Sequence, residues 1–408
     1  MAGLSRKRKA LYSAMVFVAL LVGAEVTLRA YNFSFYFNFG ADMLGMPLLD
    51  LHSIRRVMNR TVDFDPHLFW SFKPDQTLDA KGIYRKPVHI NSKGFRGEEF
   101  PEQKPKGTYR VACIGDSTTF GWSVGDDETY PYQLEGILKK DCRREVEVLN
   151  LGVTGYTSLQ GRELMLLKVK DWDPDAVVFA FGANDRLPAL KSDEEHLRDR
   201  TWDIGPVSVF LNRFQVYKLI KSGVVYVSNR MEGLSLDPAT YIPKLKRKVS
   251  PEEYVENVEK VKDACEEIGA ELIVIHVGYP SLPEDHVTQE IHEQAKKYGA
   301  ALPSQWETWD GEEIVENIRS KTRTTAFDLR PLFSRSIRLA KEGTLDPERS
   351  AEKKTALGQL AEKDPWYYLM VDNGHPNEWG HEIIAGRLAE MLETTEAYKK
   401  LCLKGAEN

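Results

Sequence analysis

The stretch YRVACIGDSTTFG, residues 109–121, decides the fold class of this chain. Its first seven residues are almost continuously apolar, which is typical of a parallel β-strand buried on both faces. The polar run from Asp116 to Thr119 follows at once, so the strand is predicted to end there. Open α/β sheets place their functional sites at the carboxyl ends of such strands, and Ser117 lies at this point.

The same alternation of strand and helix continues along the chain. Strands are predicted at 146–152, 176–182, 271–278 and 324–329, and helices at 130–140, 159–170, 254–269, 287–298 and 378–393. Because parallel strands need helical crossovers, the five strands predict an α/β fold with a flavodoxin-like, doubly wound parallel sheet.

Composition excludes several classes of protein. The 408 residues are 42% hydrophobic and 28% charged, which is typical of a folded globular chain rather than a disordered one. A net charge of -6 gives no overall attraction for phosphate backbones, so no nucleic-acid partner is expected. The four cysteines, Cys113, Cys142, Cys265 and Cys402, contain no CxxC pair. They predict no metal site, and we expect buried small residues or free thiols.

The N-terminus predicts a membrane segment. Four basic residues, Arg6 to Lys9, precede the uncharged run ALYSAMVFVALLVGA, and apolar character continues past Glu25 to Leu28. The positive flank predicts a cytoplasmic N-terminus and an extracytoplasmic body. The alternative is a cleaved signal peptide ending at Ala24, whereas continued apolar periodicity beyond that site favours a retained single-pass anchor.

The sequence divides into four parts. We expect a basic tail and transmembrane anchor at 1–30, a small β-rich accessory region at 31–105, an α/β domain with the predicted parallel sheet at 106–395 and a C-terminal tail at 396–408. Two insertions interrupt the α/β domain. Residues 186–250 contain the amphipathic stretch FLNRFQVYKLIKSGVVYV, and residues 338–364 contain a charged run predicted to be a solvated helix.

Candidate catalytic residues follow the predicted strand ends. Ser117 can act as a nucleophile if a base takes its proton. After the next two strands, Gly155 in NLGVTGYTS can offer a backbone N–H and Asn184 in GAND a side-chain amide, so these two groups and the Ser117 N–H form a candidate oxyanion hole. Asp372 precedes His375 by three residues in VDNGHP, a spacing that lets the carboxylate orient the imidazole.

These four blocks, in this order, resemble the signature blocks of the SGNH/GDSL hydrolase family. The resemblance covers about residues 106–395 and implies Ser117 as nucleophile and oxyanion donor, Gly155 and Asn184 as further donors, His375 as base and Asp372 as orienter, with no cofactor or metal. The VHINSKGFRG run, residues 88–97, also resembles the segment before the catalytic domain in membrane-anchored bacterial members. The resemblance therefore implies a bacterial inner-membrane location.

Other residues could be mistaken for site residues. Ser117 could instead cap a helix, and Asp372, Gly155 and Asn184 could be turn residues. Ser123 lies in a GxSxG sequence that resembles a nucleophile elbow, but no strand is predicted before it and no helix directly after, so it is rejected. His381 is assigned a structural rather than a metal-binding role. Burial is expected for four aromatic residues near the predicted site: Trp122, Tyr156, Trp306 and Trp309.

Three functions fit these patterns. The first is a serine esterase that hydrolyses acyl esters, including O-acetyl groups on a cell-surface polysaccharide. The second is an extracytoplasmic O-acyltransferase that uses the same triad and receives its acyl group from a membrane partner. The third is a non-catalytic carbohydrate-binding scaffold on the same fold, which the intact set of five site residues argues against.

Overall fold

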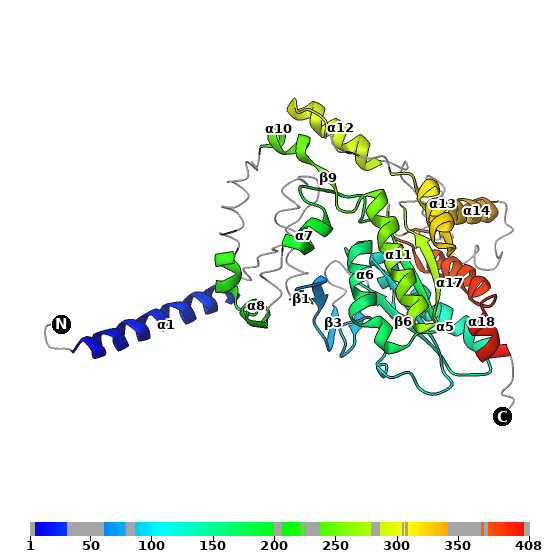
Figure 1. Ribbon diagram of the computed structural model, residues 1–408, viewed down its shortest axis with the longest axis horizontal. Coiled ribbons are helices and arrows are strands. Elements are labelled where there is room, and N and C mark those ends of the chain that lie inside the picture. The colour runs from blue at the N-terminus through cyan, green and yellow to red at the C-terminus, as the bar shows by residue number, and fades with distance from the viewer. Residues whose placement is uncertain are drawn as a thin grey trace.

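The computed structural model describes residues 5–30, 61–78, 86–199, 206–221, 224, 237–278, 286–303, 306, 309–341, 369–370 and 374–403. A five-stranded parallel sheet lies at its centre (Figure 1). The strands are β5 (Tyr109–Gly115), β6 (Val146–Gly152), β7 (Ala176–Phe181), β10 (Glu271–His276) and β11 (Thr325–Asp328), in the spatial order β11-β10-β7-β5-β6. Counted along the chain, this order is the flavodoxin-like 2-1-3-4-5, so the predicted doubly wound sheet is confirmed.

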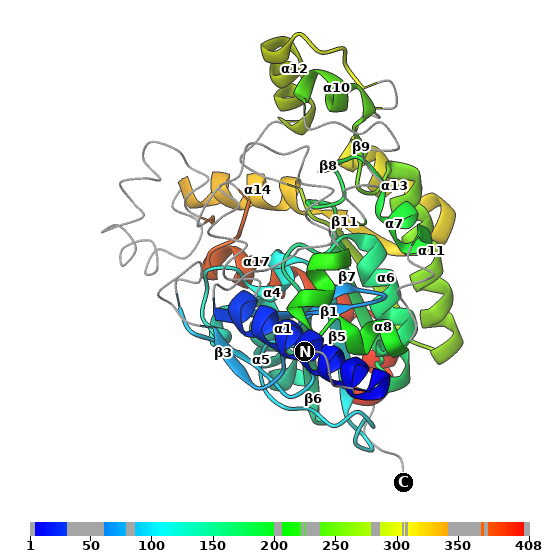
Figure 2. The ribbon, with the colours of Figure 1, turned by 90° about the vertical axis from the view of Figure 1, so that its left-hand side faces the viewer.

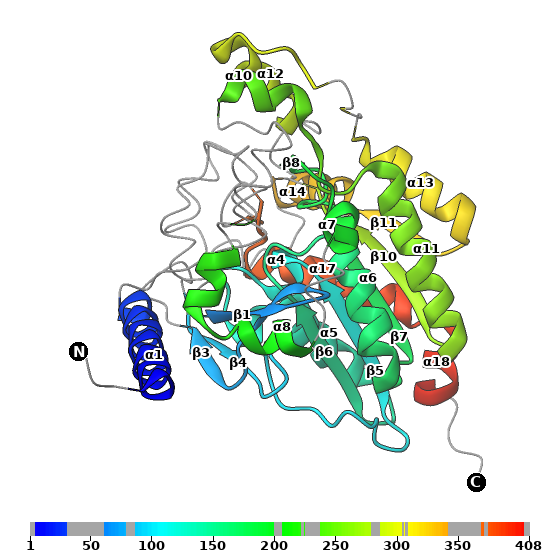
Figure 3. The ribbon, with the colours of Figure 1, turned by 60° about the vertical axis from the view of Figure 1, so that its left-hand side comes forward.

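Helices cover both faces of the sheet. One face carries α6 (Ser158–Leu167), α11 (Pro251–Ile268) and α13 (Gly311–Thr322), and the other carries α5 (Tyr130–Asp141), α14 (Leu329–Lys341) and α17 (Glu378–Leu392). Figure 3 shows α6 and α11 side by side in front of the sheet. Strand side chains alternate between the two layers: in β5, Ala112 and Ile114 join the first core, whereas Val111 and Cys113 join the second.

The accessory region supplies two short antiparallel sheets. They consist of β1 (Val62–Asp65) with β2 (Phe69–Phe72), and β3 (Gln76–Leu78) with β4 (Val88–Ile90). Their apolar residues belong to the same core as α6 and α11, and Phe72 stacks on Phe120 with ring centroids 5.2 Å apart. The accessory region therefore packs against the segment that follows Ser117.

The first insertion contains short elements. They are β8 (Pro188–Ala189) paired with β9 (Lys246–Arg247), α7 (Asp193–Asp199), α8 (Pro206–Leu211), α10 (Pro238–Tyr241) and η4 (Ile242–Lys244). Helix α12 (His286–Tyr298) packs beside α10, away from the sheet (Figure 2). In the second insertion, residues 338–341 end α14, and the charged run at 342–364 lies outside the described residues.

Near the N-terminus, α1 (Arg6–Ala30) is 25 residues long and projects from the body of the molecule (Figure 1). Its apolar window has a mean hydropathy of 2.0, and none of it is buried against the rest of the chain. Length and composition make α1 a candidate transmembrane helix, as the sequence predicts. A signal sequence near an N-terminus would have the same length and composition.

One sequence expectation about the cysteines is wrong. Cys142, which caps the end of α5, and Cys402, in η6 (Lys399–Leu403), form a disulfide rather than remaining free. Cys113 and Cys265 are buried free cysteines, as expected. The disulfide pair escaped prediction because its members are 260 residues apart, a separation that carries no spacing signal. It ties α18 (Glu396–Tyr398) and η6 to the end of α5, and Tyr398 of α18 is fully buried.

Candidate active site

Ser117 occupies the first turn after β5. Asp116 is the N-cap of the single-turn helix α4 (Ser117–Phe120), and its side chain accepts a hydrogen bond from the Thr118 N–H. The capping role that Ser117 could have filled therefore belongs to Asp116. A Cβ on Gly115 would lie 1.9 Å from Thr119 Oγ1, so the tight strand-to-helix turn requires glycine at this position. Residues around Ser117 are buried, whereas Ser117 itself is partly exposed.

The structure brings His375 to Ser117. His375 Nε2 lies 2.9 Å from Ser117 Oγ, which is hydrogen-bond distance, although the two residues are 258 positions apart. His375 lies just before α17, whose N-cap Asn377 accepts hydrogen bonds from the N–H groups of Trp379 and Gly380. This capped helix start fixes the backbone beside His375. Asp372 lies outside the described residues.

An aromatic side chain borders the Ser117–His375 pair. The ring of Trp122 lies 5.6 Å from the His375 ring, centroid to centroid, with 30° between their planes. Trp122 was expected to be buried, but its side chain is partly exposed. Its ring flanks one side of the imidazole.

Asn184 and Gly155 lie at the neighbouring strand ends. Gly155 has a φ of 83°, a conformation that favours glycine, in the turn between β6 and α6. Asn184 Nδ2 donates to the Tyr156 carbonyl at 3.0 Å and lies 3.4 Å from Asp116 Oδ2. The Asn184 amide therefore bridges the residue before Ser117 and the residue after Gly155, which brings together the three strand ends where sequence analysis placed the oxyanion donors.

Asp185 is a buried residue of this region that the sequence analysis missed. Its carboxylate accepts hydrogen bonds from the Ser158 N–H at 2.9 Å and the Gly182 N–H at 3.0 Å, and also from the Ser158 hydroxyl. Burial raises the pKa of Asp185 to about 7, in spite of these hydrogen bonds. The carboxylate joins the turn that carries Asn184 to the start of α6. Its position directly after Asn184 in GAND was the available signal.

Arg96 also contributes to the site from the accessory region. Its guanidinium is 1% exposed and donates to the backbone carbonyls of Phe120, Gly121 and Val124. It also pairs with the Asp126 carboxylate at 2.8 Å. Arg96 therefore holds the segment between α4 and η2 (Asp126–Glu128), which carries Trp122. Sequence analysis singled out VHINSKGFRG by resemblance but assigned no role to its arginine.

The other residues considered in the sequence analysis lie away from the contact between Ser117 and His375 or are buried in the fold. Ser123 has a φ of 70° and lies between α4 and η2, with neither a strand directly before it nor a helix of the elbow type directly after it, so the context of a nucleophile elbow is missing. His381 is fully buried, and its Nδ1 accepts a hydrogen bond from the Tyr130 N–H at 3.1 Å. Tyr156 and Trp309 are buried as expected, and Trp306 is partly buried beneath the Arg247 guanidinium.

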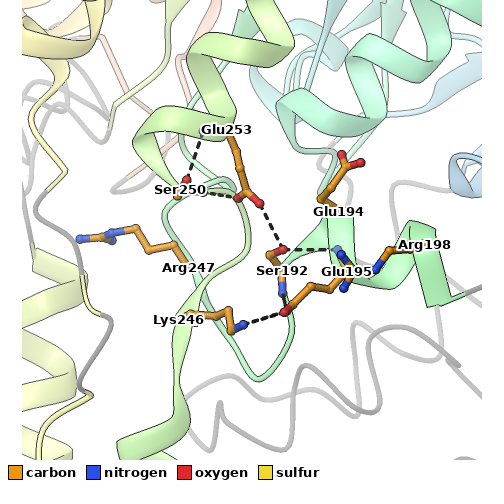
Figure 4. Close-up of a pocket in the computed structure, with 8 residues that line it drawn as sticks. All are labelled: Ser192, Glu194, Glu195, Arg198, Lys246, Arg247, Ser250 and Glu253. Atoms are coloured by element: carbon orange, nitrogen blue, oxygen red, sulfur yellow. Dashed lines mark hydrogen bonds and ion pairs between the residues drawn. The ribbon is translucent and has the colours of Figure 1, made fainter.

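A separate polar pocket of about 550 Å³ lies in the first insertion, and it contains none of the predicted catalytic residues (Figure 4). Lys246 and Glu195 point toward each other in it, with Nζ and a carboxylate oxygen 2.8 Å apart. The charged lining residues are three acids and three bases: Glu194, Glu195, Glu253, Arg198, Lys246 and Arg247. Because these charges balance, the pocket offers no net charge to an ionic ligand.

Comparisons with known proteins found a family model and several solved structures to which this chain is similar. Residues 113–305 match the family model of the GDSL-like lipase/acylhydrolase family. Among solved structures, the chain is similar to Axe2, an acetylxylan esterase from Geobacillus stearothermophilus, at 15% identity and a TM-score of 0.37, over 71% of this chain and 95% of that one. It is also similar to the lipase/acylhydrolase from Enterococcus faecalis, at 17% identity and a TM-score of 0.36, over 70% and 95%. No curated protein matches the sequence.

Proposed function

We propose that this chain is an SGNH-type hydrolase of ester bonds with Ser117 as its nucleophile, because residues 113–305 match the model of the GDSL-like lipase/acylhydrolase family. The contact of 2.9 Å between Ser117 Oγ and His375 Nε2 carries the proposal. It is the geometry that a general base needs to remove the serine proton as the hydroxyl attacks an acyl carbonyl. Asp372 is proposed to orient the imidazole from the other ring nitrogen.

The reaction proceeds through two tetrahedral intermediates. Ser117 Oγ forms a bond to the acyl carbon while His375 takes its proton, and the protonated imidazole then donates that proton to the departing alcohol. Water next attacks the acyl-serine with His375 again as base, which releases the acid and restores Ser117. The negative charge on the acyl oxygen is stabilised by the N–H groups of Ser117 and Gly155 and by the Asn184 amide.

Asn184 is suited to this role because one of its amide hydrogens is already committed. The bond of 3.0 Å to the Tyr156 carbonyl fixes the amide plane, whereas the contact of 3.4 Å with Asp116 is long and weak. The second hydrogen is therefore available to an oxyanion. A donor that is oriented before the reaction pays no reorganisation cost when charge develops.

The proposed substrates are acyl esters, with O-acetyl groups on a cell-surface polysaccharide as the favoured class. The partly exposed Trp122 ring beside His375 supports a sugar substrate, since an aromatic face packs well against the apolar face of a sugar ring. Acyl transfer to a glycan would use the same residues and would need a membrane partner as acyl donor.

The proposed location is the outer side of a bacterial inner membrane, with α1 as a retained anchor. Arg6 to Lys9 at the start of α1 favour a cytoplasmic N-terminus. The disulfide between Cys142 and Cys402 supports an extracytoplasmic body, because structural disulfides persist in oxidising compartments and are rare in the cytosol.

A series of nitrophenyl esters of increasing acyl length tests the function on the full chain in detergent, with Ser117→Ala as the control. We expect hydrolysis of the acetyl ester with no added partner, and no hydrolysis by the Ser117→Ala variant. Glycan acylation that requires a partner protein would support the transferase instead. Equal hydrolysis by wild type and Ser117→Ala would remove Ser117 from the mechanism.

A further inference from the structure

Two short helical stretches of the first insertion expose apolar side chains and bury polar ones. The stretches are α8 (Pro206–Leu211) and residues 215–221. Together with Phe214 between them and Val224 after the second, they carry six apolar side chains that are between 39% and 69% exposed: Val207, Phe210, Phe214, Leu219, Ile220 and Val224. We call these six residues the 207–224 surface. Asn212 and Lys221 are 5% and 4% exposed, and Lys221 Nζ lies 3.4 Å from Asn212 Oδ1. A helix that covers the core of a soluble protein buries its apolar side chains and exposes its polar ones, which is the opposite of this arrangement.

The 207–224 surface lies beside the end of α1. The residues from Arg213 to Val216 contact α1: Arg29 Nη2 donates to the Arg213 carbonyl at 2.8 Å, and the Val216 N–H donates to the Glu25 carboxylate at 2.9 Å. Glu25 and Arg29 also pair with each other at 2.6 Å. Figure 1 shows α8 next to the C-terminal end of α1. The surface is therefore held at a fixed position relative to that end.

The length of α1 places these contacts at a membrane boundary. At 1.5 Å per residue a 25-residue helix is about 37 Å long, somewhat more than the roughly 30 Å of bilayer hydrocarbon. Glu25 and Arg29 are charged, so they belong at the edge of that hydrocarbon rather than within it. The turn at 213–216, bonded to both residues, lies at the same level.

The composition of the surface matches a lipid interface. Phe210 and Phe214 are aromatic, and the exposed Arg213 guanidinium lies 6.0 Å from the Phe210 ring centroid. Helices that lie in the plane of a membrane combine aromatic and aliphatic residues on one side with basic residues at the headgroup level. An exposed apolar patch on a monomer otherwise marks a site where something binds.

We propose that the 207–224 surface inserts into the headgroup region of the same bilayer that α1 crosses. This inference depends on the proposal that α1 is a membrane anchor, and it does not depend on the proposed catalytic residues. A single spanning helix allows the catalytic domain to swivel about its connection to the membrane. A second contact beside the helix end fixes which side of the domain faces the lipid.

Site-specific labelling of the full chain tests the proposal. Cys113 and Cys265 are buried and Cys142 is bonded to Cys402, so one introduced cysteine is the reactive thiol among the described residues. Ile220→Cys probes the surface, because the native Ile220 side chain is 59% exposed. Tyr132→Cys on α5 is the matched control, because the native Tyr132 side chain is 57% exposed. Val18→Cys, at a position 56% exposed in the middle of α1, reports on the anchor. Each variant carries an environment-sensitive dye in vesicles of phosphatidylethanolamine and phosphatidylglycerol.

Lipids that carry a spin-label quencher at different depths decide the outcome. We expect the dye at Ile220→Cys to be quenched more strongly by a label near the glycerol end of the acyl chain than by one near its methyl end. The Val18→Cys dye should show the opposite order, and the Tyr132→Cys dye should be quenched by neither. Quenching at Val18→Cys without quenching at Ile220→Cys would overturn the surface proposal and leave the anchor intact. Quenching at Ile220→Cys without quenching at Val18→Cys would also overturn the proposal, because the surface would then contact a bilayer that α1 does not cross.

Discussion

At the residue scale, the contact between Ser117 and His375 makes a direct prediction. Ser117→Ala removes the attacking oxygen and His375→Ala removes the base 2.9 Å away, so each variant should lose activity by about four to six orders of magnitude. The double variant should be no worse than either single one, because the two residues act as a unit. Steady-state hydrolysis of nitrophenyl acetate measures this loss.

The matched control is Ser123→Ala. Ser123 lies six residues from Ser117 in a turn with positive φ, whereas the hydroxyl 2.9 Å from His375 Nε2 belongs to Ser117. We expect nearly wild-type rates from this variant. An inactive Ser123→Ala together with an active Ser117→Ala would mean that the GxSxG sequence, and not GDS, carries the nucleophile.

A second prediction separates the two proposed oxyanion donors. Asn184→Ala deletes a side-chain donor, so it should lower kcat by roughly 10²–10³ with little change in KM, for short and long acyl esters alike. Gly155→Ala keeps its backbone N–H but places a methyl group at a φ of 83°, which strains the turn and intrudes on the crevice. It should discriminate against longer acyl groups. Values of kcat and KM for acetyl and octanoyl esters with both variants provide the comparison, and an unchanged kcat for Asn184→Ala would exclude Asn184.

The site residues were predictable to different degrees. The positions of Ser117, Gly155 and Asn184 followed from the ends of continuous apolar strands, because parallel strands align their carboxyl ends. His375 was a candidate because of its spacing from Asp372, but no local pattern could show that it contacts Ser117, which is 258 residues away. Asp185 was missed because an aspartate in a turn is usually solvent-exposed. Its burial is evident only from the structure, where three groups donate hydrogen bonds to its carboxylate.

At the element scale, Arg96 joins the accessory region to the segment after Ser117. Arg96→Met would remove this donor from the Gly121 and Val124 carbonyls, and a buried carbonyl left without a donor costs about 1–3 kcal/mol. We expect lower stability and, well below the unfolding temperature, a lower kcat with KM nearly unchanged, because the turn that carries Ser117 loses its support. Thermal melts and steady-state kinetics of the same preparation separate the two effects.

Lys86→Met is the matched control for Arg96→Met. Lys86 belongs to the same accessory segment and pairs with Glu128, but its side chain is 50% exposed. Exposed ion pairs contribute little, so this variant should leave both stability and kcat close to wild type. Equal effects of the two substitutions would show that the accessory region acts only through general stability.

A further element-scale prediction concerns His381, which connects α17 to α5. Burial, together with the neighbouring Arg96 cation, lowers the pKa of His381 to about 3. The unfolded chain takes up a proton near the ordinary histidine pKa of about 6.5, whereas the folded chain stays neutral until about pH 3. Stability is therefore present above pH 6.5 and lost as pH falls toward 3, with a slope of up to about 1.4 kcal/mol per pH unit.

His381→Gln tests this pH dependence, because glutamine keeps a hydrogen-bond acceptor near the Tyr130 N–H but does not titrate. Urea unfolding at several pH values between 3 and 7 should show a smaller loss of stability for the variant than for the wild type. Parallel curves for the two proteins would mean that other groups cause the acid sensitivity.

Amphipathic character alone did not decide which helices were predicted, because the weakly amphipathic α17 was predicted and the strongly amphipathic α13 and α14 were missed. Helix α11 was predicted within three residues of its observed start, and its Ser250–Glu253 capping box explains where it begins. Helix α14 was missed because LRPLFSRSIRLAK follows the short strand β11 directly and contains a proline near its start. Proline is tolerated in the first turn of a helix, so it did not exclude one.

At the scale of the whole molecule, the disulfide between Cys142 and Cys402 reports on the compartment. The test isolates the full chain from membranes, unfolds it, alkylates its free thiols and analyses it by mass spectrometry. We expect Cys142 and Cys402 to be found as a disulfide, and Cys113 and Cys265 to be alkylated as free thiols. A version that lacks residues 1–30 should stay in the cytoplasm with all four cysteines reduced.

The same disulfide should also stabilise the fold. In the exported chain, Cys402→Ser should lower the free energy of unfolding by about 2–5 kcal/mol, because the bond closes a long loop in the unfolded state. Tyr398→Ala also loosens the C-terminal segment but keeps the disulfide, so it separates packing from covalent linkage. Alkylation of Cys142 and Cys402 in the full chain would contradict an extracytoplasmic body, whereas a mature chain that starts at Glu25 would replace the anchor with a signal peptide.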